Sequence, residues 1–394
     1  MPLATEAKEL GRNKWAPLAL GFRPFFLLGI WFAALLMGLS LYAFTTGHWR
    51  SGYFGLSLWH AHEMLFGYAT AVIAGFLLTA VRNWTNLPTP NGTALALLAL
   101  LWLTPRIFSV LPAFPPLLFA TLDILFLPVL AVVLGRLLVQ AKQPRNYPIP
   151  ALLLLMGLCN VAVHLEILGW LASVSSQAMQ IGVCLLIALI TVIGGRVVPF
   201  FMASAIGSRP HTYQLVEKLA LPSVLMFAAS LATTSHWLIT ASSLFASAVH
   251  AARLFGWFDR TILRLPMLWV LHAGYAWLVA GFLLYGPAEW MNFATAQAVH
   301  AWTVGAIGMF TLGMMARVAL GHTGRAMQAL PWMPTAFILV FVAALCRVIL
   351  PIMNPALLDI AVRISATCWI IAFMIAGIRY SLILLQARAD GKPG

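Results

Sequence analysis

The chain has 394 residues, of which 62% are hydrophobic and only 8% are charged. Water-soluble domains carry about a quarter of their residues as charged side chains, so this composition excludes a soluble globular protein and predicts a polytopic membrane protein. The net charge of +13 does not indicate nucleic-acid binding. The basic residues lie mostly between long apolar runs, as in membrane proteins that retain them on the cytoplasmic side, and they form no basic polar helix face.

Neither the cysteines nor the amino terminus indicates secretion. The first 23 residues are mixed and polar, without the apolar core and cleavage site of a removable signal peptide, so we expect insertion to rely on the first span. The cysteines lie inside apolar runs, form no CxxC motif, and are interpreted as small core residues: Cys159, Cys184, Cys346 and Cys368.

Segmentation by the length of helix that crosses a bilayer predicts about twelve transmembrane helices. The expected spans are 24–44, 60–80, 92–111, 115–138, 148–172, 179–202, 219–235, 236–256, 266–285, 296–320, 331–350 and 358–385. Connections are short and leave no room for a soluble domain. We expect an all-α membrane helix bundle with a cytoplasmic segment at 1–23, a single transmembrane domain at 24–385 and a cytoplasmic tail at 386–394.

The basic residues predict the orientation of these spans. With a cytoplasmic amino terminus, nineteen of the 23 Lys and Arg residues fall in inner loops or adjoining helix ends. The four that remain outside are Arg50, Arg106, Arg347 and Arg363. This bias continues through all twelve spans and predicts that both termini are cytoplasmic.

Histidines inside the spans are the first functional signal. An ionisable side chain at membrane depth costs about 2.5–3.5 kcal/mol on insertion scales, so each one requires a partner, a cavity or a cofactor. Six histidines meet this description: His60, His62, His164, His250, His272 and His300.

His60 and His62 lie two residues apart near the start of the second span. On a helix this spacing separates side chains by about 200°, so the two imidazoles face nearly opposite directions. Opposed imidazoles suit two different centres flanking one helix. The alternative is that one of them, His60, lies in interfacial water while the other hydrogen-bonds a neighbouring helix.

The polar residues of the spans fall into two layers of depth. The outer third of the bilayer is expected to hold His60, His62, Glu63, His164, Glu166 and His300. The inner third is expected to hold His250, His272, Arg196 and Arg253, with Arg317 and His322 at the end of the tenth span. Imidazoles at matching depths suit haem or copper in a bundle core, whereas zinc is less favoured because no cysteine joins them and no HExxH is present.

The sixth span contains two glycines, an arginine and a proline in residues 193–200. Such a segment is expected to be kinked or interrupted, which frees backbone groups for a buried site. Arg196 is a candidate partner for a haem propionate or an anionic substrate, and Arg253 and Arg317 are similar candidates. The alternative for each arginine is that its side chain extends to the cytoplasmic surface.

A faint internal similarity links the second and tenth spans, because His60-Ala61 and His300-Ala301 are each followed 22 residues later by a basic or imidazole group, Arg82 or His322. Matches of this kind arise easily by chance, and no repeat is inferred from them.

Four motifs resemble those of the NnrS family. They are GFRPFF at 21–26, WHAHEM at 59–64 continuing through Gly67 to GFLLTA at 75–80, GGRVVPF at 194–200, and LGMMARVALGHTGR at 312–325. The resemblance spans most of the chain and contains no departure from the family pattern. It carries His60, His62, Glu63, Arg196, Arg317 and His322 as motif members.

The resemblance implies a bacterial inner-membrane protein with about twelve spans that contains haem and copper. It also implies a role in nitric oxide metabolism, denitrification and tolerance of nitrosative stress. Nitric oxide is then the small-molecule ligand, the lipid bilayer is the surrounding partner, and the electron donor is unknown.

Our first hypothesis is an oxidoreductase, similar to nitric oxide reductases, that reduces nitric oxide at a histidine-ligated haem–metal centre. Protons would come from Glu63 or Glu166. The candidate residues for binding haem, taken as b-type, or other cofactors are His60, His62, His250, His272, His300, Arg196 and Arg317. The candidate metal ligands are His60, His62, His164, His300 and His322.

The second hypothesis is a non-enzymatic carrier or transporter for a metal, haem or small anion, with its substrate site at the interrupted sixth span. No matching interrupted segment occurs in the other half of the chain, so this hypothesis ranks second. A haem absorption band and bound copper in the purified protein would favour the first hypothesis over the second.

Overall fold

The computed structural model describes residues 15–49, 52–111, 114–207, 209–291 and 295–392. These residues are almost entirely helical and contain no β-strand, which confirms the all-α prediction. The described helices divide into two compact units. Unit 1 comprises residues 1–174, 314–333 and 373–394, and unit 2 comprises residues 175–313 and 334–372.

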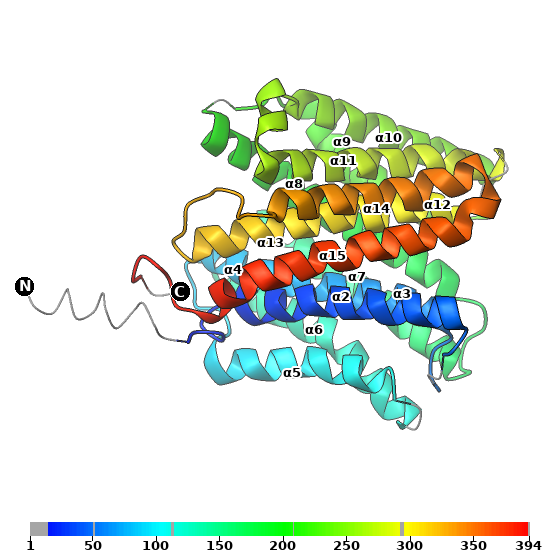
Figure 1. Ribbon diagram of the computed structural model, residues 1–394, viewed down its shortest axis with the longest axis horizontal. Helices are drawn as coiled ribbons and strands as arrows, with labels where there is room; N and C mark the ends of the chain where they lie inside the picture. The colour runs from blue at the N-terminus through cyan, green and yellow to red at the C-terminus, as the bar shows by residue number, and fades with distance from the viewer. Residues whose placement is uncertain (1–14, 50–51, 112–113, 208, 292–294, 393–394) are drawn as a thin grey trace, which may run out of the picture. The chain divides into compact units, whose positions relative to one another are not determined.

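Unit 1 is built on helices from the first part of the chain (Figure 1). They are α2 (Phe22–Thr46), α3 (Leu56–His62), the π-helix η1 (Glu63–Ala69), α4 (Thr70–Thr85), α5 (Gly92–Phe108), α6 (Pro116–Gln140), the short η2 (Pro144–Asn146) and α7 (Pro148–Ile167). Helix α4 packs against α2 and α6, and α6 packs against α5 and α7. This packing brings α3 to α7 around one buried polar cluster.

Unit 2 follows the same all-helical plan. Its elements are α8 (Ser175–Ile206), α9 (Gln214–Ser230), α10 (His236–Trp257), η3 (Arg260–Arg264), α11 (Pro266–Tyr285), η4 (Gly286–Glu289), α12 (Thr295–His300) and the π-helix η5 (Ala301–Ile307). They continue with α13 (Gly308–His322), α14 (Met333–Met353), η6 (Pro355–Leu357) and α15 (Leu358–Leu385). The end of α13 and the end of α15 belong to unit 1.

Ten helical segments of the described chain are long and apolar enough to cross a membrane. The expected count of about twelve is not confirmed, and the helices at the two other expected spans, α5 and α9, are shorter, with 17 residues each. The expected span 148–172 ends at Ile167, and 219–235 is shifted to Gln214–Ser230. The protein is a multi-pass membrane protein, and the cytoplasmic location of its termini stays a prediction.

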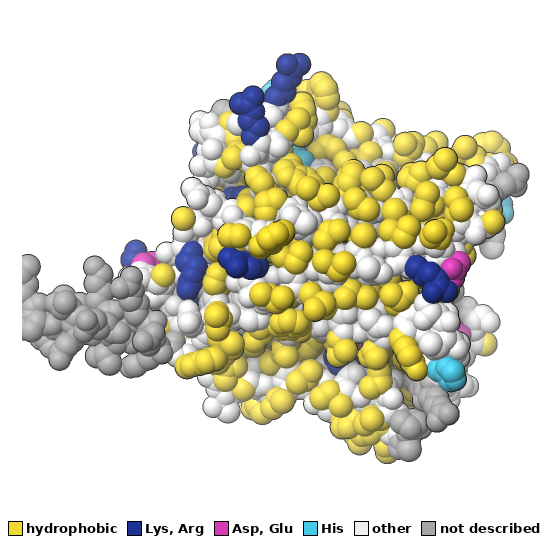
Figure 2. All heavy atoms as spheres, in the orientation of Figure 1, with side chains coloured by type: hydrophobic (Ala, Val, Ile, Leu, Met, Phe, Trp, Pro, Cys, Tyr) yellow, Lys and Arg dark blue, Asp and Glu magenta, His cyan; other side chains and the backbone are white. Residues whose placement is uncertain are grey.

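The outer surfaces of the helices are hydrophobic. Large apolar side chains are strongly exposed along them, among them Leu97, Leu158 and Phe255. On the face drawn in Figure 2, hydrophobic side chains cover the helices while acidic and basic side chains are few. Helices that are apolar on every side require lipid rather than water around them, which agrees with the exclusion of a soluble protein.

Helix α8 corrects the expectation of an interrupted sixth span. It runs without a break through 32 residues, Gly194, Gly195 and Pro199 included. The glycines provide room for neighbours in unit 2: a Cβ atom on Gly195 would overlap the Arg253 guanidinium, and one on Gly194 would lie 3.1 Å from the Phe310 ring. The GG pair therefore permits close packing of a helix that is not interrupted.

The expected second and tenth spans, which share a faint sequence similarity, have the same local helix geometry. In each, a short α-helix ending in a histidine passes into a seven-residue π-helix and then into a longer α-helix. The π-helices begin at Glu63 and Ala301, so the equivalent histidines are His62 and His300. The sequence comparison had paired His60 with His300, which is two residues out of this register.

Candidate metal centre

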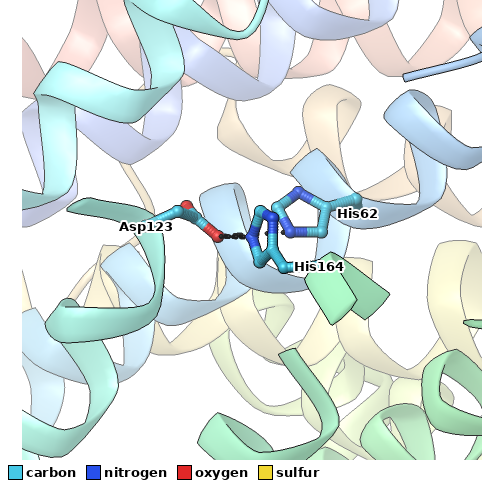
Figure 3. Close-up of side chains that lie close together, drawn as sticks. All are labelled: His62, Asp123 and His164. Carbon is cyan, nitrogen blue, oxygen red and sulfur yellow. Dashed lines mark hydrogen bonds and ion pairs between the residues drawn. The ribbon is translucent and has the colours of Figure 1, made fainter. Parts of the chain in front are cut away.

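Three buried side chains of unit 1 converge on one point (Figure 3). His62, Asp123 and His164 each offer a ligand atom, and all these atoms lie within 4.8 Å of one another. The Asp123 Oδ2 atom is 3.3 Å from His62 Nε2 and 3.0 Å from His164 Nε2. Among the residues that the structure describes, this is the only group of His, Cys, Asp and Glu side chains with the spacing of a metal site.

Three helical segments position these ligands. His62 ends α3 immediately before the π-helix η1, Asp123 lies in α6, and His164 lies in α7. Asn160 lies one helical turn before His164 and so shares its face of α7. A π-helix is a rare element that often occurs at functional sites, and here it follows directly on the ligand His62.

Hydrogen bonds determine which ring nitrogens carry hydrogen. Asn160 donates from Nδ2 to Asp123 Oδ2 over 2.7 Å, so its Oδ1 atom accepts from His62 Nε2 over 2.8 Å. His164 Nε2 donates to Asp123 Oδ2, which leaves its Nδ1 to accept from the Tyr53 hydroxyl over 2.7 Å. Burial raises the pKa of Tyr53, so the hydroxyl keeps its hydrogen.

Arg106 balances part of the negative charge. Its guanidinium donates to Glu63 Oε2 over 2.9 Å and forms an ion pair with Asp123. Gly67 makes room for this contact, since a Cβ atom there would lie 2.9 Å from the Glu63 carboxylate and 3.0 Å from Arg106. Two carboxylates and one guanidinium leave the buried cluster with one net negative charge when both imidazoles are neutral.

The donor set fits a metal ion. In a tetrahedral site with arms of about 2.0–2.1 Å, ligand atoms are about 3.3 Å apart, close to the two separations measured from Asp123. Each imidazole would bind through Nε2 and keep a partner for Nδ1. These partners are the Glu63 carboxylate, 3.3 Å from His62 Nδ1, and the Tyr53 hydroxyl, 2.7 Å from His164 Nδ1. Such outer contacts orient metal-binding histidines.

Other predicted residues of unit 1 lie outside this cluster. His60 faces away from His62, and its Nδ1 atom is 3.0 Å from the Ser40 hydroxyl of α2. Glu166 accepts a hydrogen bond from the backbone N–H of Val174 and so holds the turn after α7. His322 packs against Phe22, with ring centroids 5.8 Å apart. Phe22 lies about 27 Å along α2 from Ser40, so His322 and His60 are at opposite ends of that helix.

Unit 2 contains a separate polar network. His250 Nδ1 accepts from the Tyr275 hydroxyl over 2.6 Å, and Arg253 donates to the same oxygen over 3.1 Å. Arg253 is also paired with Glu217 and donates to the Thr191 carbonyl oxygen. The network provides Arg253 with partners inside the protein, so its side chain does not extend freely to the surface.

The haem candidates of unit 2 are enclosed by protein. His250 is fully buried with its ring stacked on Phe282, and His272 is buried with Nδ1 directed to the Leu268 carbonyl oxygen. Their Nε2 atoms make no hydrogen bond of ordinary geometry, as an axial ligand requires. The role of both histidines in binding haem stays a prediction.

The remaining candidates are dispersed. His300 lies at the end of α12 with Nδ1 2.6 Å from the Ala296 carbonyl oxygen. Arg196 is half-buried in α8, and Arg317 is buried in α13. The structure therefore brings together only His62, Glu63 and His164 of the predicted site residues in unit 1.

Sequence reasoning missed Asp123, Arg106, Asn160 and Tyr53. One signal was present, because Asp123 is a lone carboxylate in the apolar run 115–138, and such a residue requires a partner as much as a histidine does. Arg106 was predicted only to lie on the outer side of the membrane, and the structure adds that its side chain is buried against Glu63 and Asp123.

Comparison with known proteins supports the family resemblance. The search of curated proteins found no match. The sequence model of the NnrS protein family matches residues 16–388, nearly the whole chain. The protein therefore belongs to the NnrS family of nitric oxide-related membrane proteins, which is associated with metal and haem binding.

Proposed function

We propose that the protein binds one copper ion through His62, Asp123 and His164 and reduces nitric oxide there, as an oxidoreductase of the bacterial inner membrane. The observation that carries this proposal is the convergence of three buried donors at metal-ligand spacing, with an outer partner for each imidazole. Three protein ligands leave a coordination position for a small molecule.

Ligand type and charge favour copper. Imidazole and carboxylate donors bind copper or zinc, and the family resemblance favours copper. The net charge of the cluster is negative by one, so a cuprous ion would neutralise it, which matters because unbalanced charge is costly in a buried site. Copper also exchanges single electrons, which zinc does not.

The residues around the ligands suit the chemistry of the reaction. Reduction of two nitric oxide molecules to nitrous oxide and water consumes two protons and two electrons, and the electrons require an external donor. Glu63 contacts both His62 and Arg106, so its carboxylate lies beside the centre, where it can pass protons to the reaction while the guanidinium keeps it oriented. Asn160 and Arg106 hold Asp123 in place.

Metal analysis of ligand variants tests the binding site. We expect about one copper ion per chain in the wild-type protein. Copper affinity should fall by at least about 10–100-fold in His62→Ala, His164→Ala and Asp123→Asn, because loss of an outer partner of a metal ligand already has an effect of that size. His236→Ala, an exposed histidine at the start of α10, is the matched control and should bind copper normally. Normal binding by all three ligand variants would contradict the proposal.

Anaerobic assay of copper-loaded protein with nitric oxide and an artificial electron donor tests catalysis. We expect consumption of nitric oxide, and a slower rate per bound copper ion in Glu63→Gln, assayed with excess copper because the variant loses the outer partner of His62. No consumption by fully loaded protein would contradict the reductase proposal and leave copper binding with a sensing or handling role. An absorption spectrum of the same preparation shows whether haem is present.

A further inference from the structure

A cavity of about 350 Å³ lies beside the metal centre in unit 1. The described residues that line it are Gly52, Tyr53, Phe108, Leu111, Phe114, Pro115, Pro116 and Phe119. Two of these residues contact a proposed ligand: Tyr53 hydrogen-bonds His164, and the Phe119 ring centroid is 5.7 Å from that of His164. The Tyr53 and Phe119 rings themselves pack 4.6 Å apart, so together they form the wall between the cavity and the imidazole.

We infer that this cavity is the access site for a small uncharged ligand of the metal centre, and that Tyr53 donates a hydrogen bond to that ligand when the metal is bound. The inference rests on the proposed copper site. It adds the chemical class of the ligand, its route and a positioning residue.

The lining determines the class of ligand. The described lining side chains are apolar apart from the Tyr53 hydroxyl, and none of them is charged. Among the described lining residues an ion would find only the Tyr53 hydroxyl as a partner, whereas a small neutral molecule loses little on entering. The volume exceeds the share of one liquid water, about 30 Å³, many times over, so diatomic molecules enter readily.

The hydrogen bond between Tyr53 and His164 determines the role of the hydroxyl. In the metal-free arrangement His164 carries its hydrogen on Nε2 and Tyr53 donates to Nδ1. A metal on Nε2 moves the imidazole hydrogen to Nδ1, which then donates to the Tyr53 oxygen. The direction of this hydrogen bond is thereby reversed, and the hydroxyl hydrogen of Tyr53 turns from His164 toward the cavity that the same residue lines.

Carbon monoxide on cuprous-loaded protein is a suitable probe, because it is small, uncharged and detected by infrared absorption. After flash photolysis, we expect carbon monoxide to rebind several-fold more slowly in Leu111→Trp, whose larger side chain fills the cavity. Leu97→Trp is the matched control, an exposed leucine of α5 outside the cavity, and should rebind at the wild-type rate. Tyr53→Phe, loaded with excess cuprous ion because it loses the outer partner of His164, should shift the carbon monoxide band.

Xenon provides a second measurement on the unaltered protein, because apolar cavities bind it. Xenon under pressure should slow rebinding in the wild-type protein and much less in Leu111→Trp. If copper binds but no carbon monoxide band forms, or if neither Leu111→Trp nor xenon changes the rate, the cavity inference is overturned while the copper site stands. An unchanged band in Tyr53→Phe overturns the role of the hydroxyl. Absence of copper binding overturns both proposals.

Discussion

Asp123 is the residue on which the polar cluster of unit 1 depends. Its carboxylate accepts from Asn160 and His164 at Oδ2 and pairs with Arg106 at Oδ1. These contacts come from α5 and α7, on either side of α6. A buried carboxylate is tolerated when such partners satisfy it, and the same partners hold its oxygen where a metal ion would bind.

The pair of Glu63 and Arg106 predicts a large loss of stability on mutation. Arg106→Leu leaves two buried carboxylates without their cation, and breaking a buried pair costs about 3–5 kcal/mol. Arg363→Leu removes an arginine of the exposed pair with Asp359 and should cost at most about 1 kcal/mol. Thermal unfolding in detergent measures both.

The double variant Arg106→Leu/Glu63→Gln distinguishes the source of this loss. It should recover part of the stability, because one uncompensated charge is removed together with the guanidinium. Equal effects of Arg106→Leu and Arg363→Leu would contradict the buried pairing.

Residue types predicted part of this site. His62, Glu63 and His164 were identified because ionisable groups in apolar runs need partners, and the opposed directions of His60 and His62 followed from helical geometry. Their shared partner was not predictable from spacing. Asp123 is 61 residues beyond His62, and only the packing of α6 against α7 and α4 brings the two together.

At the scale of elements, Gly195 illustrates how one missing side chain permits a close approach between helices. The Arg253 guanidinium of α10 occupies the space that a Cβ atom on this residue of α8 would need. Arg253 cannot simply withdraw, because Glu217, Thr191 and Tyr275 all hold it. Gly195 of the GGRVVPF motif therefore allows α8 to pack against the buried Arg253 side chain of α10.

Gly195→Ala should lower the unfolding temperature by disturbing this network. Overpacking of a dense interior typically costs about 1–3 kcal/mol. Gly38→Ala in α2 is the matched control: apart from the adjoining backbone of its own helix, nothing lies within 4 Å of its added Cβ, so the change should be neutral or slightly stabilising through better helix propensity. Thermal unfolding of the two variants compares them, and equal effects would show that Gly195 has no packing role.

The two π-helices are element-scale features that no sequence pattern indicated. A threonine lies just beyond each π-helix and donates from its hydroxyl to backbone carbonyl oxygens of the preceding turn. Thr70 donates to Phe66 and Gly67, and Thr311 donates to Ile307 and Gly308. Such bonds satisfy backbone carbonyls near the change of helix type. Hydrophobic periodicity is too coarse to reveal one extra residue per turn.

At the scale of the whole molecule, the two ends of the described chain meet in unit 1. The Ala16 N–H donates to the Leu385 carbonyl oxygen over 2.7 Å, and the Ala389 N–H donates to Thr323 over 2.9 Å. The first and last described residues of the chain therefore lie close together in this unit. Arg388 adds a hydrogen bond to the His322 carbonyl oxygen.

The attachment of the tail should depend on pH. The Arg388 guanidinium, which hydrogen-bonds the Asp390 carboxylate, holds the pKa of Asp390 below its ordinary value. Because the pKa is lowered, the ionised carboxylate stabilises the attached tail fully when the pH is above the free aspartate pKa of about 3.9. This stabilisation is lost as the pH falls through the lowered pKa. Hydrogen exchange at the Ala389 amide should therefore accelerate in acid beyond its intrinsic pH dependence.

Asp390→Asn is the control for this titration. It should show weaker protection of the Ala389 amide at neutral pH and no additional loss in acid. An identical pH profile in the variant and the wild type would exclude Asp390 as the titrating group.

The amino-acid sequence by itself determined the helical membrane class, most helix positions, the family and the histidines that need partners. Hydrophobic length and unpaired ionisable groups are local properties of a chain in lipid, so they can be read along it. Tertiary structure decided which of those histidines meet, that Asp123, Arg106 and Tyr53 join them, and that the glycines of α8 admit a neighbour. Those outcomes depend on the rotation of each helix about its axis, which is set by packing against helices distant in the chain.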